Sequence, residues 1–208
     1  MNGLFITFEG VDGSGKSLML KLAAQKLRAC GYDVLCTMEP GGSPLGRQLR
    51  QIILDSPYGT VDPRGELLLY AADRALHVSK VIQPALAAGR IVLCDRYIDS
   101  SYAYQGGGRS IETEDIRLLN DFAAYGLLPD VTFLLDLPAA EALSRLHGPK
   151  DRIEQEDLSF FENIAAAYRR LAESEKERFH VIDATRSIDE ESAEINNIIM
   201  QKLKARTE

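Results

Sequence analysis

The stretch FEGVDGSGKS, residues 8–17, constrains the fold more than any other part of the chain. It fits the pattern G-x-x-x-x-G-K-[ST], in which backbone N–H groups surround a phosphate, the lysine reaches the outer phosphates and the hydroxyl binds Mg²⁺. The apolar run LFITF precedes it, and SLMLKLAAQKLRA, with apolar residues at helical spacing, follows it. Strand, glycine-rich loop and helix form the setting that this motif requires. We therefore predict a phosphate-binding loop (P-loop) made of Gly10, Val11, Asp12, Gly13, Ser14, Gly15, Lys16 and Ser17.

Five short apolar runs predict β-strands, at residues 4–9, 33–38, 90–95, 131–137 and 179–184. The runs are nearly continuous rather than alternating, as is typical of parallel strands whose two faces are both covered. Helical patterns separate them, at residues 16–29, 45–54, 64–87, 113–125, 139–147, 157–177 and 188–204. Strands that alternate with helices indicate a doubly wound, three-layer α/β fold. The 208 residues suit a single domain, so we expect one over 1–208.

Charge and cysteine content exclude several classes of partner. The net charge is −7 and no apolar run approaches the length of a membrane span, which argues against nucleic acid or a membrane as a partner. Cys30, Cys36 and Cys94 form no C-x-x-C pair, and Cys36 and Cys94 fall in strands that we predict to be buried. Free buried thiols are typical of the reducing cytosol, so we expect a cytoplasmic protein.

Polar, glycine-rich segments follow the predicted strands: GVDGSGKS, EPGGSPLGR, DRYIDSSYAYQGGGR and, one helix later, SRLHGPKDRIEQED. In open α/β sheets, ligands bind beyond the carboxyl ends of the strands, so we expect these segments to converge there. They carry Arg47, Arg50, Arg96, Arg109, Arg145 and Arg152, while Arg74 lies in the helix predicted at 64–87. Clustered arginines suit phosphoryl transfer, because its transition state spreads charge over the phosphoryl oxygens. Asp95 ends a strand where P-loop proteins commonly place the carboxylate that orients Mg²⁺.

Several P-loop classes lack support in the sequence. A GTPase needs an N-K-x-D segment to read its base, and a transport ATPase carries an L-S-G-G-Q-like signature; the chain contains neither. At this size, a kinase for a small molecule is the natural alternative.

The segments FEGVDGSGKS, EPGGSPLGRQLR, LLLYAADRALHV, DRYIDSSYAYQGGGR and DRIEQED occur in this order within residues 8–157. Together they closely resemble the bacterial thymidylate kinase family. The resemblance implies the P-loop NTPase fold with strand order 2-3-1-4-5, a homodimer, and the Mg²⁺-dependent reaction of ATP with dTMP to give ADP and dTDP. Two alternatives stay open: a kinase for another nucleoside monophosphate, and a nucleotide-binding regulator without catalysis. Intact Lys16, Ser17 and Asp95 count against the regulator.

The resemblance also implies roles for individual residues around the phosphates. It places ATP on the P-loop, Mg²⁺ on Ser17 and, through water, on Asp95. It assigns Asp12 to the sugar 3′-hydroxyl near the metal, and Arg50 and Arg96 to the acceptor phosphate. Glu39 and Pro40 line the same region, with a cis peptide bond expected before Pro40.

A second group is implied to hold the nucleoside of dTMP. Arg74 reaches the thymine carbonyl, and Ser101 and Gln105 read the edge of the base, since an amide can both donate and accept. Tyr70 stands where the family usually has a phenylalanine stacked on thymine, so an aromatic face is kept. Tyr104 packs beneath the sugar, where a 2′-hydroxyl would collide.

The last implied element is a lid at about residues 144–154. Thymidylate kinases carry a catalytic arginine either in the P-loop or in the lid, and residues 10–17 contain none. His147 stands where an arginine is expected, which leaves Arg145 and Arg152. We favour Arg152 for the transferring phosphoryl and Arg145 for the nucleotide, where it would stack on adenine. The expected catalytic set is therefore Lys16, Asp12, Arg96, Arg152 and Arg145.

Overall fold

The computed structural model describes residues 3–55 and 61–206. A five-stranded parallel sheet has the order β2-β3-β1-β4-β5, which confirms the prediction. Its strands are β1 (Leu4–Glu9), β2 (Val34–Met38), β3 (Ile91–Asp95), β4 (Val131–Asp136) and β5 (Phe179–Asp183). In the centre of the sheet, Phe8 pairs with Asp95 on one side and with Phe133 on the other. Because all strands are parallel, their carboxyl ends meet at one edge.

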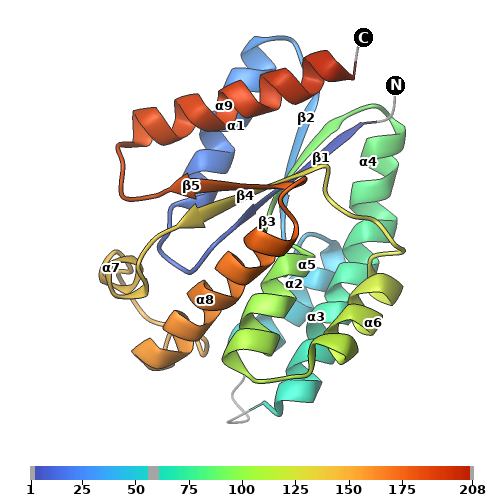
Figure 1. Ribbon diagram of the computed structural model, residues 1–208. Coiled ribbons are helices and arrows are strands. Elements are labelled where there is room, and N and C mark those ends of the chain that lie inside the picture. Colours follow the sequence, from blue (N-terminus) through green and yellow to red (C-terminus); the bar gives the residue numbers. More distant parts are fainter. Residues whose placement is uncertain (1–2, 56–60, 207–208) are drawn as a thin grey trace.

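Helices cover both faces of the sheet and complete the expected three layers (Figure 1). One face carries α1 (Lys16–Ala29) and α9 (Ile188–Ala205), which pack on each other. The opposite face carries α8 (Leu158–Ser174) and a long helix made of α3 (Pro63–His77), the π-helical turn η1 (Val78–Ile82) and α4 (Gln83–Ala87). This long helix confirms the one predicted at 64–87.

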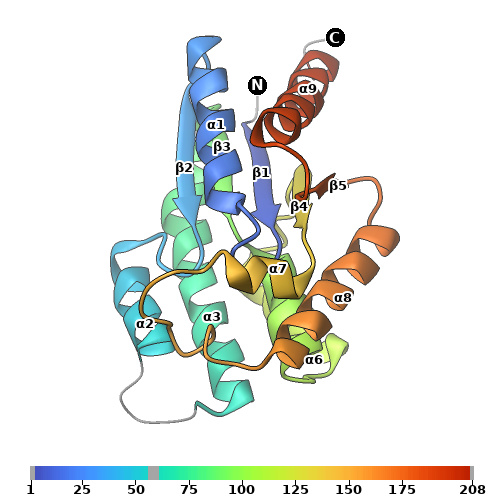
Figure 2. The same cartoon turned by 90° about the vertical axis from the view of Figure 1, so that its left-hand side faces the viewer.

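Three further helices surround the carboxyl edge and the outer side of α3. The strands point toward α2 (Pro44–Leu54) and α7 (Ala139–Ser144) (Figure 2), and α2 and α6 (Thr113–Ala123) both pack on α3. Ser43 begins α2 by accepting a hydrogen bond from the backbone N–H of Gly46 at 3.0 Å, as an N-cap residue does. Within residues 3–55 and 61–206, no helix has the length and apolar character needed to cross a bilayer.

The prediction that Cys36 is buried is wrong, because β2 lies at the edge of the sheet. β1 is buried along its whole length, whereas β2 alternates between covered and exposed residues and leaves Cys36 exposed. Cys94 is buried in β3, as predicted. All three cysteines lie among the described residues and are free thiols.

The segment after β3 is helical, which the sequence pattern did not predict. It contains α5 (Ile98–Ser101) and the π-helical η2 (Tyr102–Gly108), both packed beside α8 or α6. Glycines at 106–108 disfavour a helix by local propensity. However, a Cβ on Gly107 would lie only 2.7 Å from the Cβ of Ala167 on α8. These glycines allow close helix packing, so tertiary contact prevails over local preference.

Candidate active site

A cleft of about 490 Å³ opens at the carboxyl edge of the sheet. It brings together most of the predicted site residues: Asp12, Gly13, Gly15, Lys16, Ser17, Glu39, Pro40, Arg50, Tyr70, Arg74, Asp95, Arg96, Ser101, Tyr104, Gln105 and Arg145. This volume suits a small-molecule ligand. The cleft therefore joins the P-loop and the residues expected to hold an acceptor nucleotide in one continuous space.

The P-loop has the backbone that its glycines allow. Gly13 and Gly15 have φ of 84° and 95°, a left-handed region that side-chain-bearing residues rarely adopt. The loop leads directly into α1, and Lys16 and Ser17, the first residues of this helix, line the cleft. The free N–H groups of a helix N-terminus therefore lie at the cleft. Ser14 is buried, and its Oγ has no hydrogen-bond partner among the described residues. The loop thus presents the donors that an anion requires.

Lys16 lies in the wall of the cleft with its charge partly uncompensated. Its Nζ donates to the carbonyl of Val11 at 2.8 Å. Burial, together with the charge of Arg96, lowers the pKa of Lys16 to about 8, although Asp12 and other carboxylates oppose this change. An anionic ligand beside Nζ would favour the charged form.

Asp12, Arg96 and Tyr104 form a connected charge cluster across the cleft. Arg96 Nη2 lies 2.5 Å from Asp12 Oδ1, and the Tyr104 hydroxyl donates to Asp12 Oδ2 at 2.7 Å. Burial by itself would raise the pKa of Asp12, but Arg96, Lys16 and the tyrosine hydrogen bond lower it to about 2. Arg96 has φ of 71°, a conformation that costs energy in a non-glycine residue and is concentrated at functional sites.

Ser17 and Asp95 meet at the base of the P-loop, where the Ser17 hydroxyl donates to Asp95 Oδ2. No group of three or more His, Cys, Asp or Glu side chains suited to a metal occurs in the described part of the chain. A hydroxyl and a carboxylate fit Mg²⁺, which takes oxygen ligands and commonly completes its shell with water and substrate phosphates.

The other end of the cleft carries the residues expected to read the acceptor. Arg74 is 1% exposed, and its guanidinium donates to Glu39 Oε2 at 2.9 Å and to Ser101 Oγ at 3.0 Å. Arg50 Nη1 donates to the carbonyl of Pro40 at 2.9 Å. The peptide bond between Glu39 and Pro40 is cis, as predicted. These contacts hold two guanidiniums in place beside Tyr70 in the cleft wall.

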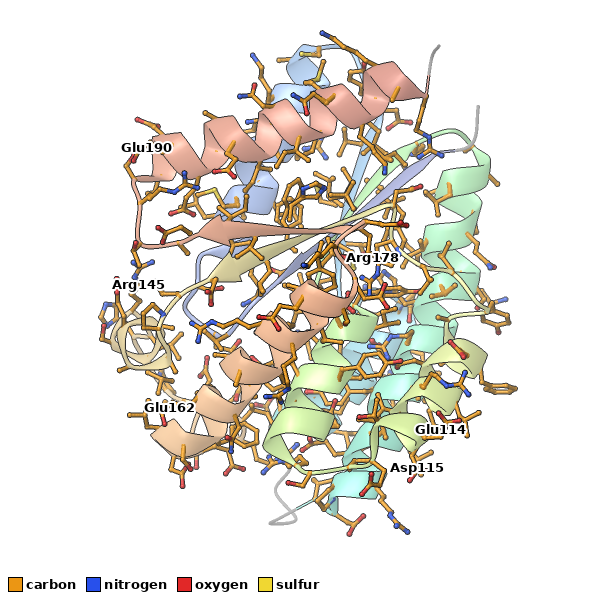
Figure 3. All side chains as sticks on the ribbon, in the orientation of Figure 1. Glu114, Asp115, Arg145, Glu162, Arg178 and Glu190 are labelled. Atoms are coloured by element: carbon orange, nitrogen blue, oxygen red, sulfur yellow. The ribbon has the colours of Figure 1, made fainter. Side chains whose placement is uncertain are left out.

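The predicted arginines do not all reach the cleft. Arg145 is the C-cap residue of α7 (Figure 3). It lines the cleft, and its Nη2 lies 2.7 Å from Glu141 Oε1. Arg152 is absent from the lining, because its Nη2 binds Glu66 at 2.6 Å. Arg109 also contacts Glu66, and Arg47 is exposed on α2. We predicted that the six loop arginines converge at this edge of the sheet. The prediction is wrong for Arg47, Arg109 and Arg152, whereas Arg50, Arg96 and Arg145 do line the cleft.

Glu9 is a buried residue of this region that the sequence analysis missed. Its carboxylate accepts hydrogen bonds from Ser100 at 2.6 Å and Tyr168 at 2.8 Å, and both hydroxyls also contact Arg96 at 3.3 Å. Burial is the main reason that the pKa of Glu9 rises to about 7. The sequence did contain a sign of this role, because Glu9 ends an otherwise apolar strand. A carboxylate is tolerated at such a buried position only when it is hydrogen-bonded or paired with a charge.

Glu66 was missed as well, although the sequence contained a signal for it. Glu66, Tyr70 and Arg74 follow one another at intervals of four residues, so they share one face of α3. Glu66 is 1% exposed and receives a hydrogen bond from Gln105 Nε2 at 2.9 Å. Glu66 thus holds Gln105, one of the residues predicted to read the base.

Comparisons with known proteins agree with this geometry. The family model described as thymidylate kinase matches residues 8–195. A thymidylate kinase of Exiguobacterium sp. (strain ATCC BAA-1283 / AT1b) is 45% identical over 98% of this chain and 97% of its own length. One from Clavibacter sepedonicus is 51% identical over 88% of each chain. The crystal structure of thymidylate kinase from Ehrlichia chaffeensis superposes with a TM-score of 0.78 at 32% identity, covering 96% of this chain and 99% of that one. With its P-loop and acceptor residues lining one cleft, this chain belongs to the thymidylate kinase family.

Proposed function

We propose that this chain transfers the γ-phosphoryl group of ATP to the 5′-phosphate of dTMP, giving ADP and dTDP on the route to dTTP. The observation that carries the proposal is the single cleft that holds the P-loop at one end and Arg74, Tyr70 and Gln105 at the other. Phosphoryl transfer depends almost entirely on positioning and on electrostatic stabilisation. One cleft lined by cations between two nucleotide sites meets both needs.

On the donor side, the P-loop amides and Lys16 hold the β- and γ-phosphates of ATP in this proposal. Ser17 would hold Mg²⁺ directly and Asp95 through water, and the bound ion would neutralise part of the phosphate charge. Arg145, at the rim, contacts the nucleotide. The lid at 144–154 and the single kinase domain over 1–208 belong to the same proposal.

On the acceptor side, Arg50 and Arg96 hold the phosphate of dTMP, next to Glu39 and Pro40. Asp12 is charged at neutral pH because its pKa is about 2, and it accepts a hydrogen bond from the sugar 3′-hydroxyl. The base stacks on Tyr70, while Arg74, Ser101 and Gln105 contact its edge. Each of these residues lines the cleft, which is the support for assigning them together.

The proposal is tested by an ADP-release assay with a panel of monophosphates: dTMP, dUMP, dCMP, dGMP and dAMP. We expect dTMP to have the highest kcat/KM. The 5-methyl group of thymine distinguishes it from uracil by only about 10–200-fold in an apolar pocket, so dUMP should be the next best substrate. A higher kcat/KM for another monophosphate would make that nucleotide the substrate in place of dTMP. Absence of turnover with every member of the panel would favour a nucleotide-binding regulator without catalysis.

A homodimer is part of the proposal, supported by exposed apolar side chains on α3, on α6 and in the segment that follows α6. The surface, which we name the α3–α6 face, comprises Leu68, Leu118, Phe122, Tyr125 and Leu128, and Phe122 is 83% exposed. The other side of the long helix is covered, because Val78 and Ile82 are fully buried in the core. Because α3 and α6 pack on each other, these exposed side chains lie on neighbouring elements, and an isologous contact would cover them.

Sedimentation at micromolar concentration should therefore give the mass of a dimer. Phe122→Glu, which places a charge in the middle of the contact, should shift the mass to that of a monomer. Val181→Glu is a matched control, because Val181 is 50% exposed on β5 rather than on the α3–α6 face. A monomeric wild-type protein would refute the dimer, and equal effects of the two variants would move the contact away from this face.

Sugar selection provides a separate prediction. Tyr104 is 7% exposed, and its hydroxyl is held by Asp12 at 2.7 Å and by Arg96 at 2.9 Å, so the ring cannot easily move aside. Tyr104→Ala should raise the kcat/KM of UMP relative to dUMP by about tenfold or more, since these nucleotides differ only at the 2′ position. Tyr104→Phe, which keeps the ring, should leave the ratio near that of the wild type. An unchanged ratio in Tyr104→Ala would assign the discrimination to another contact.

The remaining parts of the proposal concern location and partners. We place the enzyme in the cytoplasm, supported by three free cysteines, two of them exposed. The absence of nucleic-acid and membrane partners stays a prediction from the net charge of −7.

A further inference from the structure

Glu66 receives hydrogen bonds from three different parts of the chain. Gln105 Nε2 donates to its Oε1 at 2.9 Å, Arg152 Nη2 donates to its Oε2 at 2.6 Å, and Arg109 Nε approaches Oε1 at 3.5 Å. Glu66 is 1% exposed and is not among the residues that line the cleft, whereas Gln105 is. The carboxylate therefore acts on a ligand in the cleft only through the residues that it holds.

The charge state of Glu66 determines how the Gln105 amide is oriented. The Glu66 carboxylate forms ion pairs with the guanidiniums of Arg109 and Arg152, and a carboxylate can only accept hydrogen bonds. Gln105 must then turn its NH₂ group toward Glu66. Its Oε1 receives no hydrogen bond from the described residues, which leaves an acceptor available beside the cleft.

This orientation has a consequence for base recognition. Thymine and uracil carry a hydrogen on N3, which an amide oxygen accepts, whereas N3 of cytosine has no hydrogen and would face that oxygen as a second acceptor. A buried acceptor without a donor is strongly disfavoured, so sites built around hydrogen bonds reject mismatched ligands well. We propose that Glu66 is a positioning residue that fixes Gln105 as an acceptor and so selects pyrimidines with an N3 hydrogen. This inference rests on the proposed function.

The test compares kcat/KM for dCMP and dUMP in the Glu66→Gln variant by ADP release. These two nucleotides differ only at positions 3 and 4 of the ring, so the 5-methyl pocket does not contribute. A glutamine at position 66 can offer either an oxygen or an NH₂ group, which lets the Gln105 amide turn over and donate to N3 of cytosine. The ratio of dCMP to dUMP should rise about tenfold or more, because the mismatched acceptor pair is removed.

Two controls separate orientation from a general structural role. Arg152→Ala removes another partner of Glu66 but keeps its bond to Gln105, so the ratio should stay within about twofold of wild type even if kcat falls. In a Gln105→Ala background, adding Glu66→Gln should not change the ratio any further. If Glu66→Gln folds poorly, a double variant of Glu66→Gln with Arg152→Gln takes its place. It removes the Arg152 guanidinium, which would otherwise lose the charge of its Oε2 partner.

The outcomes distinguish the inference from the proposed function. Suppose that wild type turns over dTMP. If Glu66→Gln, or the double variant where the single one folds poorly, lowers kcat/KM for dCMP and dUMP by the same factor, Glu66 does not set the orientation of Gln105 and the inference is wrong. A further rise of the ratio in the Gln105→Ala background would also overturn it, by showing that Glu66 acts through another residue. Failure of wild type to phosphorylate dTMP would refute the proposed function instead.

Discussion

Lys16→Ala should lower kcat for dTMP phosphorylation by at least about a hundredfold, the size of effect seen when one charge-stabilising donor is removed from a preorganised site. Lys16 is 6% exposed in the cleft wall, and within the described residues its Nζ donates a hydrogen bond only to the carbonyl of Val11. Its charge therefore faces the place where phosphates are proposed to lie. Burial of this charge disfavours folding, so the variant should not lose thermal stability.

The control for this variant lies on the same helix. Lys21 is exposed on α1, and Lys21→Ala should leave kcat, KM and the melting temperature near those of wild type. Turnover of dTMP by purified Lys16→Ala within about tenfold of wild type would show that Lys16 is not a catalytic group.

The pH dependence gives an independent readout of the same residue. The pKa of Lys16 is lowered to about 8, so the free enzyme loses this charge as the pH rises through that value. The kcat/KM for ATP reports the free enzyme and should fall above pH 8, whereas kcat should stay level to higher pH because bound phosphates raise the pKa again. Lys16→Arg, whose guanidinium stays protonated, should show no such fall. A level wild-type profile to pH 10 would contradict this assignment.

Arg152→Ala should lower kcat by about a hundredfold or more with little change in the KM for ATP, as expected for a charge that meets the transferring phosphoryl only in the transition state. In the structure, Arg152 is bound elsewhere: it contacts Glu66 at 2.6 Å and donates to the carbonyl of Ile53 at 3.0 Å. Reaching the phosphoryl requires that it leave both partners. The lid joins α7 to α8 through Gly148, whose φ is 98°, and such connections can close over a substrate.

Arg145→Ala is the matched comparison within the same lid. Arg145 already lines the cleft, its side chain is 41% exposed, and its ion pair with Glu141 is too exposed to hold it firmly. A ground-state contact with the nucleotide would make this variant raise the KM for ATP with little loss of kcat. The reverse pattern in the two variants would exchange their roles, and near-wild-type kinetics in both would show that the lid does not supply the catalytic charge.

Much of the architecture was predictable from short segments of sequence. The apolar runs located all five strands to within one residue, because a buried parallel strand needs nearly every side chain to be apolar. The P-loop was equally clear, since its glycines occupy left-handed backbone positions at fixed spacing between a strand and a helix. Residues within one such motif interact mainly with near neighbours in the chain, so their spacing carries the information.

The tertiary structure decided which separate segments meet. Cys36 is exposed because its strand ends the sheet, and residues 98–108 are helical because α8 packs against their glycines. Arg152 and Gln105 both bind Glu66, although they lie 86 and 39 residues from it along the chain. No local pattern encodes such pairs, because their contact depends on how whole helices pack. The sequence by itself thus determined the phosphate loop and the layers, and only the packing of distant elements determined the partners of the arginines and of the base-reading amide.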